Sequence, residues 1–158
     1  MKNKEKLNVF INLLKSRIGF SFNIEDFDDR LKLQKYVFIS KYFGFNHDYS
    51  YNLYIRGPYS SDLANDYYDI SNNEINSNSS LEMNINSFSS LIKDKNIKWL
   101  ESAATMLSLY FNYNSNYTKK NKIDSNRLIK ETSTIKHRID IDTIKTVYSD
   151  LDDYNLFN

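Results

Sequence analysis

The chain has 158 residues, a formal net charge of +1 and 41% hydrophobic residues. This length and composition are typical of one globular domain with a sizeable core, and they predict a single domain over residues 1–158. The balanced charge argues against a typical nucleic-acid-binding protein, and the absence of cysteine excludes disulfides and a cysteine nucleophile. Without an apolar run of membrane-spanning length or a signal peptide, a cytoplasmic protein with no membrane partner is expected.

The first third of the chain predicts two helices, each closed by a glycine. Over residues 4–18 apolar side chains recur at the spacing of one helical face, and Gly19 follows as a C-terminal cap. A second helix, expected to be largely buried, starts within residues 23–28 and ends at Gly44. The acids from Glu25 to Asp29 favour helix capping over a pair of catalytic carboxylates.

Residues 49–56 alternate in a period of two, which is typical of a strand. The pair Gly57–Pro58 then predicts a rigid corner, because glycine tolerates positive φ and proline fixes φ and has no N–H group. The corner is expected to end the strand and direct a helix over residues 62–70, with Ser60 or Ser61 as its cap.

The remainder predicts one short strand and several helices. "LEMNIN", residues 81–86, alternates and is expected to pair as a second strand after a polar loop at residues 71–80. The other helices are expected over residues 87–93, 96–113, 124–133 and 140–151, with a basic connector at 114–122. The fold class expected is mainly α, with a winged helix-turn-helix-like core, a small β-hairpin and a C-terminal helical extension.

Two stretches, "RLKLQKYVFISKYFG" and "YNLYIRGPYSSDLANDY", support a family resemblance. The chain resembles the YwgA-type proteins of bacteria and archaea and, more distantly, the Panacea or SocA-like antitoxin domain. The shared features are these: Leu33-Gln34-Lys35, Gly57-Pro58-Tyr59-Ser60, Leu63 and Asp66, and more loosely Trp99-Leu100-Glu101 and residues 136–151. A departure is Arg56, where an aromatic residue is frequent.

This resemblance implies a compact winged-helix fold and, from the antitoxin relatives, the binding and neutralising of a partner protein. It supplies no catalytic residue. Within the shared motif, the side chains of Gln34 and Lys35 are expected to lie around the buried helix and bond the strand or the turn.

The favoured hypothesis is a non-enzymatic interaction protein, antitoxin-like or regulatory, that binds a partner protein. Its candidate binding residues surround the corner: Arg56, Gly57, Pro58, Tyr59, Ser60, Asp62 and Asp66. The many tyrosines in this region are typical of protein interfaces, so a homodimer is also plausible on composition.

A DNA-binding transcriptional regulator is the alternative, and an enzyme is the least favoured reading. The candidate phosphate contacts are Arg30, Lys32, Lys35, Lys41, Lys119, Lys120, Lys122 and Arg127. An ordinary solvated surface is the favoured explanation of these cations, because lysine is common throughout the chain and acids are interleaved with them. The helix before the expected wing carries Asp62, Asp66 and Asp69 and no cation, which argues against placing it in a major groove.

No metal, cofactor or small-molecule substrate is expected. His47 and His137 are read as exposed polar side chains, since the sequence shows no further ligands beside them. The segments "DIDT" and "DLDDYN" lack the glycine and closing glutamate of a calcium loop, and the lone Gly57 does not make a glycine-rich phosphate loop.

Overall fold

The computed structural model describes residues 2–72, 80–116 and 123–157, which are mainly helical with one small antiparallel hairpin. The described elements, in chain order, are α1 (Asn3–Ile18), α2 (Phe27–Ser40), the 3-10 helix η1 (Lys41–Phe43), β1 (Asn52–Tyr54), β2 (Gly57–Tyr59), α3 (Ser61–Asn72), α4 (Ile85–Ile92), α5 (Ile97–Asn116), α6 (Ser125–Ile135) and α7 (Ile141–Asp153).

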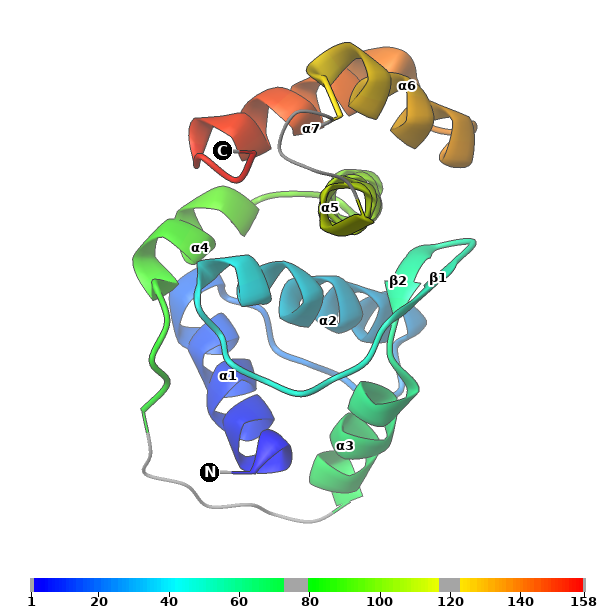
Figure 1. The fold of residues 1–158 in the computed structure, drawn as a ribbon. Helices are drawn as coiled ribbons and strands as arrows, with labels where there is room; N and C mark the ends of the chain where they lie inside the picture. The colour runs from blue at the N-terminus through cyan, green and yellow to red at the C-terminus, as the bar shows by residue number, and fades with distance from the viewer. Residues whose placement is uncertain (1, 73–79, 117–122, 158) are drawn as a thin grey trace.

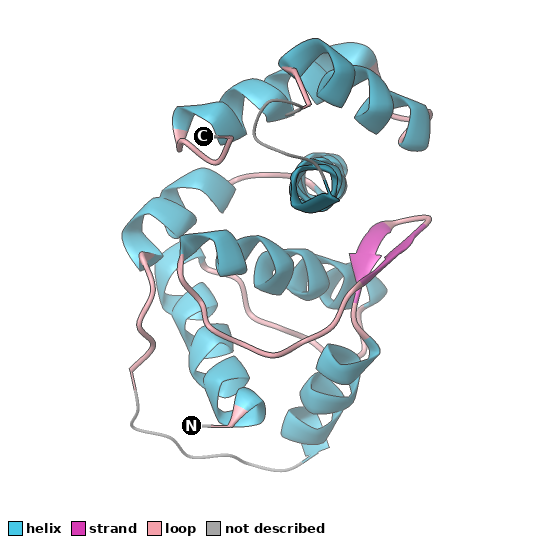
Figure 2. Cartoon of the chain, in the orientation of Figure 1, coloured by secondary structure: helices cyan, strands magenta, loops and turns pink. Residues whose placement is uncertain are grey.

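Helix α5 lies at the centre of the fold (Figure 1). On one side it packs against α2 and β2, and on the other side α6 and α7 cover it. Helix α1 packs against α3 and α4 below α2. The hairpin projects beside α2 and α5, on the side where α3 begins (Figure 2). The mainly helical prediction is therefore confirmed.

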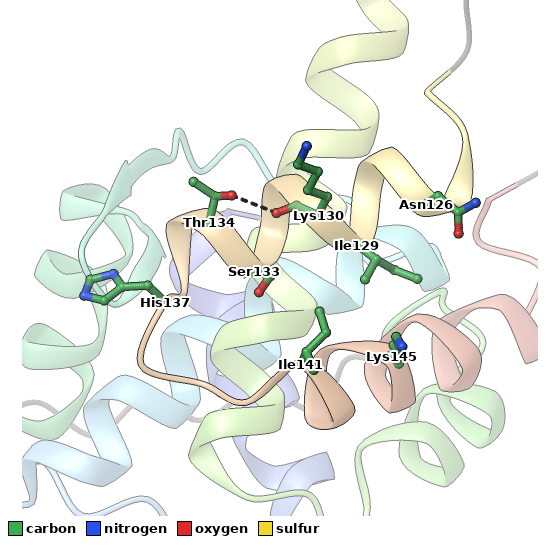
Figure 3. Close-up of a pocket in the computed structure, with 8 residues that line it drawn as sticks. All are labelled: Asn126, Ile129, Lys130, Ser133, Thr134, His137, Ile141 and Lys145. Carbon is green, nitrogen blue, oxygen red and sulfur yellow. Dashed lines mark hydrogen bonds between the residues drawn. The ribbon is translucent and has the colours of Figure 1, made fainter.

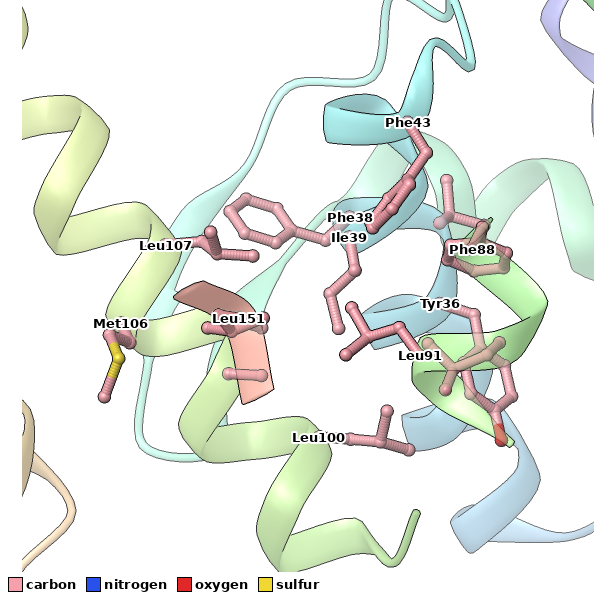
Figure 4. Packing of buried hydrophobic residues seen from close by; sticks show 14 of the residues in the cluster. Tyr36, Phe38, Ile39, Phe43, Phe88, Leu91, Leu100, Met106, Leu107 and Leu151 are labelled. Atoms are coloured by element: carbon pink, nitrogen blue, oxygen red, sulfur yellow. The ribbon is translucent and has the colours of Figure 1, made fainter. Parts of the chain in front are cut away.

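One hydrophobic cluster joins side chains from all seven described α-helices, and Figure 4 shows part of it. Helix α5 contributes the most side chains to this cluster, and in α2 every side chain from Leu33 to Ser40 is buried. Because this part of α2 has no face open to solvent, other elements must surround it, and α5, η1 and β2 are among them. Rings fill the core edge to face, for example Phe10 against Phe45 and Phe43 against Phe88.

The expected helix ends are confirmed at three places. Gly19 has φ +70° and closes α1, and Gly44 has φ +96° after η1. Asp26 is the N-cap of α2, and its carboxylate accepts from the N–H groups of Asp28 and Asp29. The acids at residues 25–29 thus include a helix cap, as expected.

The prediction that Gly57–Pro58 forms a corner after the strand is wrong in one respect. The pair does not end a strand; it forms most of β2, which pairs antiparallel with β1 through Leu53 opposite Pro58 and Tyr54 opposite Gly57. The chain reverses at Ile55 and Arg56 instead. Proline is tolerated in β2 because a two-stranded sheet consists only of edge strands. Helix α3 still begins shortly after the pair, at Ser61.

The prediction of a second strand at residues 81–86 is also wrong. Residues 81–84 are irregular, and α4 already begins at Ile85. Asn84 starts a helix where the alternating sequence predicted a strand. Its side chain caps α4 by accepting from the N–H of Ser87, and its own N–H donates to the carbonyl of Phe43. The hairpin consequently precedes α3 and does not follow it as the expected wing would. Within the described residues, no helix combines the length and the apolar character that crossing a membrane requires.

Candidate functional site

Helix α2 holds the hairpin through two adjacent buried side chains. The side-chain amide of Gln34 donates to the carbonyl of Ser60 at 2.9 Å, and the N–H of Ser60 donates back to Gln34 Oε1 at 2.9 Å. Ser60 Oγ in turn accepts from the N–H of Leu63 in the first turn of α3. This confirms that Gln34 bonds the strand region, and it fixes the point at which β2 passes into α3.

Lys35 makes the second contact, as expected from the sequence. Its Nζ donates to the carbonyl of Pro58 at 2.7 Å, and the residue is only 1% exposed. Burial lowers the pKa of Lys35 from 10.5 to about 7, although the nearby charge of Glu101 acts in the opposite direction.

The approach of Lys35 to β2 explains why position 57 is a glycine. Gly57 has φ +97°, and a Cβ there would lie 3.2 Å from Thr105 Oγ1 and 3.3 Å from Lys35 Cε. The backbone conformation and the crowding both disfavour a side chain at this position. The Gly–Pro pair therefore lets a strand lie directly on a buried lysine and on α5.

A second buried ionic group holds the turn of the hairpin. Lys136, which follows α6, donates from Nζ to the carbonyl of Ile55 at 2.8 Å and lies 3.4 Å from Glu101 Oε2. Arg56 Nη1 lies 3.7 Å from the other carboxylate oxygen of Glu101. The hairpin is thereby connected to α5 and to the end of α6 as well as to α2. A buried carboxylate needs such partners, because an unpaired one carries a large desolvation cost.

Two open pockets lie on either side of the hairpin tip, and both include Tyr54, Ile55 and Arg56. We call the first the α2–hairpin pocket; its volume is about 540 Å³ and its lining residues are Phe27, Arg30, Leu31, Lys35, Tyr54, Ile55, Arg56, Gly57, Tyr59, Tyr67 and Tyr68. The second has a volume of about 660 Å³ and lies toward Glu101, Lys136 and the loop after α6.

The tip itself is apolar and exposed. Ile55 is 93% exposed, and its neighbour Tyr54 is 53% exposed. Phe27 and Tyr68 add exposed rings around the α2–hairpin pocket. The tyrosines of this region were expected as interface residues, whereas Phe27 and Ile55 were not, because the alternation of residues 49–56 grouped Ile55 with the side chains of one strand face. We call Phe27, Tyr54, Ile55 and Tyr68 the tip patch.

The predicted partner-binding residues are only partly on the surface. The side chain of Arg56 is 60% exposed, Asp62 is exposed, and Tyr59 lines the α2–hairpin pocket. Gly57, Pro58 and Ser60 are buried and shape the hairpin from within. Asp66 is half-buried and accepts a hydrogen bond from the hydroxyl of Tyr49 at 2.6 Å.

The predicted phosphate contacts are not brought together by the described residues. Lys35 is buried, so its placement among surface cations was wrong; Arg30 lines the α2–hairpin pocket, and Lys41 is exposed at the far end of α2. Lys32 is half-buried beside the start of α5. Arg127 is exposed on α6 and pairs with Glu131. Lys119, Lys120 and Lys122 lie outside the described residues.

The histidines divide into one buried and one exposed residue. The expectation of an exposed His47 was wrong, because its ring is packed between Phe45 and Tyr49, with Nδ1 accepting from the N–H of Tyr49. His137 is exposed, as expected. Across residues 2–72, 80–116 and 123–157, histidine and acidic side chains form no cluster of three that would hold a metal ion.

A further pocket of about 490 Å³ lies between α6 and α7 (Figure 3). Its polar groups come from side chains such as Lys130 and Lys145, which are exposed, and the hydroxyl of Thr134 is already bonded to the carbonyl of Lys130. No buried charge faces it among its lining residues. The hairpin region is therefore the stronger candidate site.

Comparison with protein-family models gives no match, and neither a curated protein nor a solved structure matches the chain.

Proposed function

We propose that this chain is a non-enzymatic interaction protein, of an antitoxin-like or regulatory kind, that binds a partner protein with the tip patch. The observation that carries the proposal is Ile55, which is 93% exposed at a hairpin turn whose backbone is held from behind by a buried lysine. Exposed apolar side chains that gather on a rigid support are typical of docking surfaces.

The rigidity of the support is part of the argument. Hydrogen bonds from Lys35, Gln34 and Lys136 attach the hairpin at three points, so little ordering entropy is lost when a partner covers it. The aromatic residues around the tip are of the kind that is enriched at interfaces. The winged-helix description also belongs to this proposal: a helical core with a short hairpin is compatible with it, and the antitoxin resemblance of residues 30–68 points the same way.

Site-specific photocrosslinking tests the proposal. A photoreactive phenylalanine analogue is placed at position 55 and, as the matched control, at Ile141, an exposed isoleucine on α7 that is 43% exposed. We expect position 55 to yield one major adduct in extracts of the source cells, identified by mass spectrometry, and position 141 not to yield it. Addition of Tyr54→Ala at the neighbouring position should weaken the adduct, with the circular dichroism of the protein unchanged.

Equal adducts at both positions, or none at position 55, would contradict the proposal. An adduct between two copies of this chain would identify the homodimer as the relevant interface. The DNA-binding alternative is addressed in parallel by a mobility-shift assay on duplex DNA at low and high salt, because phosphate contacts weaken steeply as salt rises.

A further inference from the structure

The lining of the α2–hairpin pocket combines basic side chains with aromatic rings. Its lining includes the guanidinium groups of Arg30 and Arg56 and the buried amine of Lys35, and none of its lining residues is acidic. Its apolar wall includes Leu31, Ile55 and the rings of Phe27, Tyr54, Tyr59, Tyr67 and Tyr68. The occupant with complementary chemistry combines a negative charge with an apolar body.

Two of the cations are brought together from separate elements. The guanidinium of Arg30 lies 5.8 Å from the centre of the Phe27 ring, and that of Arg56 lies 5.3 Å from the same centre. Cation–π contact with the ring stabilises each charge but does not neutralise it. Two guanidinium groups near one ring raise the local positive charge, which favours an anion at this part of the pocket.

The charges of the pocket are only partly compensated within the protein. Arg30 donates to the carbonyl of Ile24, and Lys35 donates to that of Pro58, so both acceptors are uncharged backbone oxygens. Arg56 Nη1 lies 3.7 Å from the carboxylate of Glu101, which is also paired with Lys136. A guanidinium has five N–H donors and binds carboxylates in a planar, bidentate geometry, which gives the arginine pair capacity for one more acid.

We propose that the α2–hairpin pocket binds an acidic residue of the partner protein, with an adjacent apolar side chain of the same segment packed on the tyrosine rings. In this arrangement Arg30 and Arg56 hold the carboxylate, and Tyr59, Tyr67 and Tyr68 contact the apolar side chain. The inference rests on the proposed function, because it names the chemistry of the partner that the tip patch would dock.

Peptide titrations followed by NMR test this proposal. The probes are N-acetyl-Phe-Asp-amide and its neutral match N-acetyl-Phe-Asn-amide, which differ only in the charged group. We expect the acidic peptide to shift the backbone resonances of Arg56, Gly57 and Tyr59 and to bind about tenfold more tightly than the neutral one, as expected for one charge-assisted contact. Arg30→Gln and Arg56→Gln should each abolish the preference. Arg17→Gln, at the exposed end of α1, is the control and should preserve it.

Three results would overturn the proposal: equal affinity for the two peptides, no shift with either peptide, or a preference that survives both pocket substitutions. Tighter binding of 3-phenylpropionate than of the acidic peptide would assign the pocket to a small carboxylate, and displacement of the peptide by a short DNA duplex would assign it to phosphate. Failure of the peptides together with a specific adduct at position 55 would reject the acidic chemistry while the proposed docking function stands.

Discussion

His47 shows how burial changes a single side chain. Both ring nitrogens have partners: Nδ1 accepts from the N–H of Tyr49, which leaves Nε2 to donate to the carbonyl of Val37 at 3.3 Å. This arrangement requires the neutral ring. Burial lowers the pKa of His47 from 6.5 to about 4, against the smaller opposing effect of the Val37 hydrogen bond.

Acid should therefore destabilise the protein through His47. Between pH 6.5 and 4 the unfolded chain binds a proton at this site that the folded protein does not, so stability falls as the pH falls through this range. We expect the loss to approach about 1.4 kcal/mol per pH unit. Urea denaturation at several pH values measures it, and His47→Gln, which cannot titrate, should show a shallower dependence. Parallel slopes for the two proteins would contradict this account.

The hairpin contains the Gly57–Pro58 motif, and its turn forms part of the candidate site. Glycine at 57 allows β2 to lie against Lys35 and Thr105, and proline at 58 presents its carbonyl to the lysine. The tip residues then lie beyond the edge of the core, where Ile55 and Tyr54 are exposed. A short strand of this kind would not be stable alone, so its position depends on the buried contacts with α2 and α5.

Substitution of Gly57 by alanine should cost more stability than the same change at Gly19. Both glycines have positive φ, but a Cβ at Gly19 would meet nothing within 4 Å, whereas at Gly57 it would press on Thr105 and Lys35. The shared backbone strain is worth about 1–2 kcal/mol, and the crowding at Gly57 should add at least about 1 kcal/mol.

Chemical denaturation of the two variants provides the comparison, with Gly19→Ala as the control for the backbone strain. Equal destabilisation by the two substitutions would mean that the close approach of β2 to α2 and α5 is not maintained in solution.

The sequence predicted the helices well and the hairpin poorly, for a physical reason. Helices such as α1 and α2 are specified locally, by the spacing of apolar residues and by the caps at Asp26 and Gly19. The pairing of β1 with β2 depends on contacts with α2 and α5, which lie far away along the chain. The alternation at residues 81–86 was equally strand-like, but the cap formed by Asn84 decided against it.

The site was also visible in the sequence only in part. Gln34 and Lys35 were correctly expected to bond the strand region, because polar residues inside a buried helix need partners. The pairing of Glu101 with Lys136 and Arg56 was not predicted, since three separate segments supply it. A single acid within the apolar run from Trp99 to Leu107 was the available signal for a buried charge.

In the whole molecule, α5 connects the parts that the hairpin requires. It packs against α2 and β2 on one side and against α6 and α7 on the other, and it carries both Glu101 and Thr105 toward the hairpin. The proposed docking surface is therefore supported by the core and is not a separate loop. The position of the hairpin depends most on the buried contact between Lys35 and the strand.

Titration of the Lys35 side chain by NMR, through the Cε–Hε resonance assigned with Lys35→Arg, tests that contact most directly. Burial predicts a pKa of about 7 for this amine, well below the ordinary value of 10.5. A midpoint near 7 in the folded protein would agree with a strand that seals the lysine from water. A midpoint near 10.5 would show that the amine is solvated, and the anchored hairpin and its docking surface would then have to be abandoned.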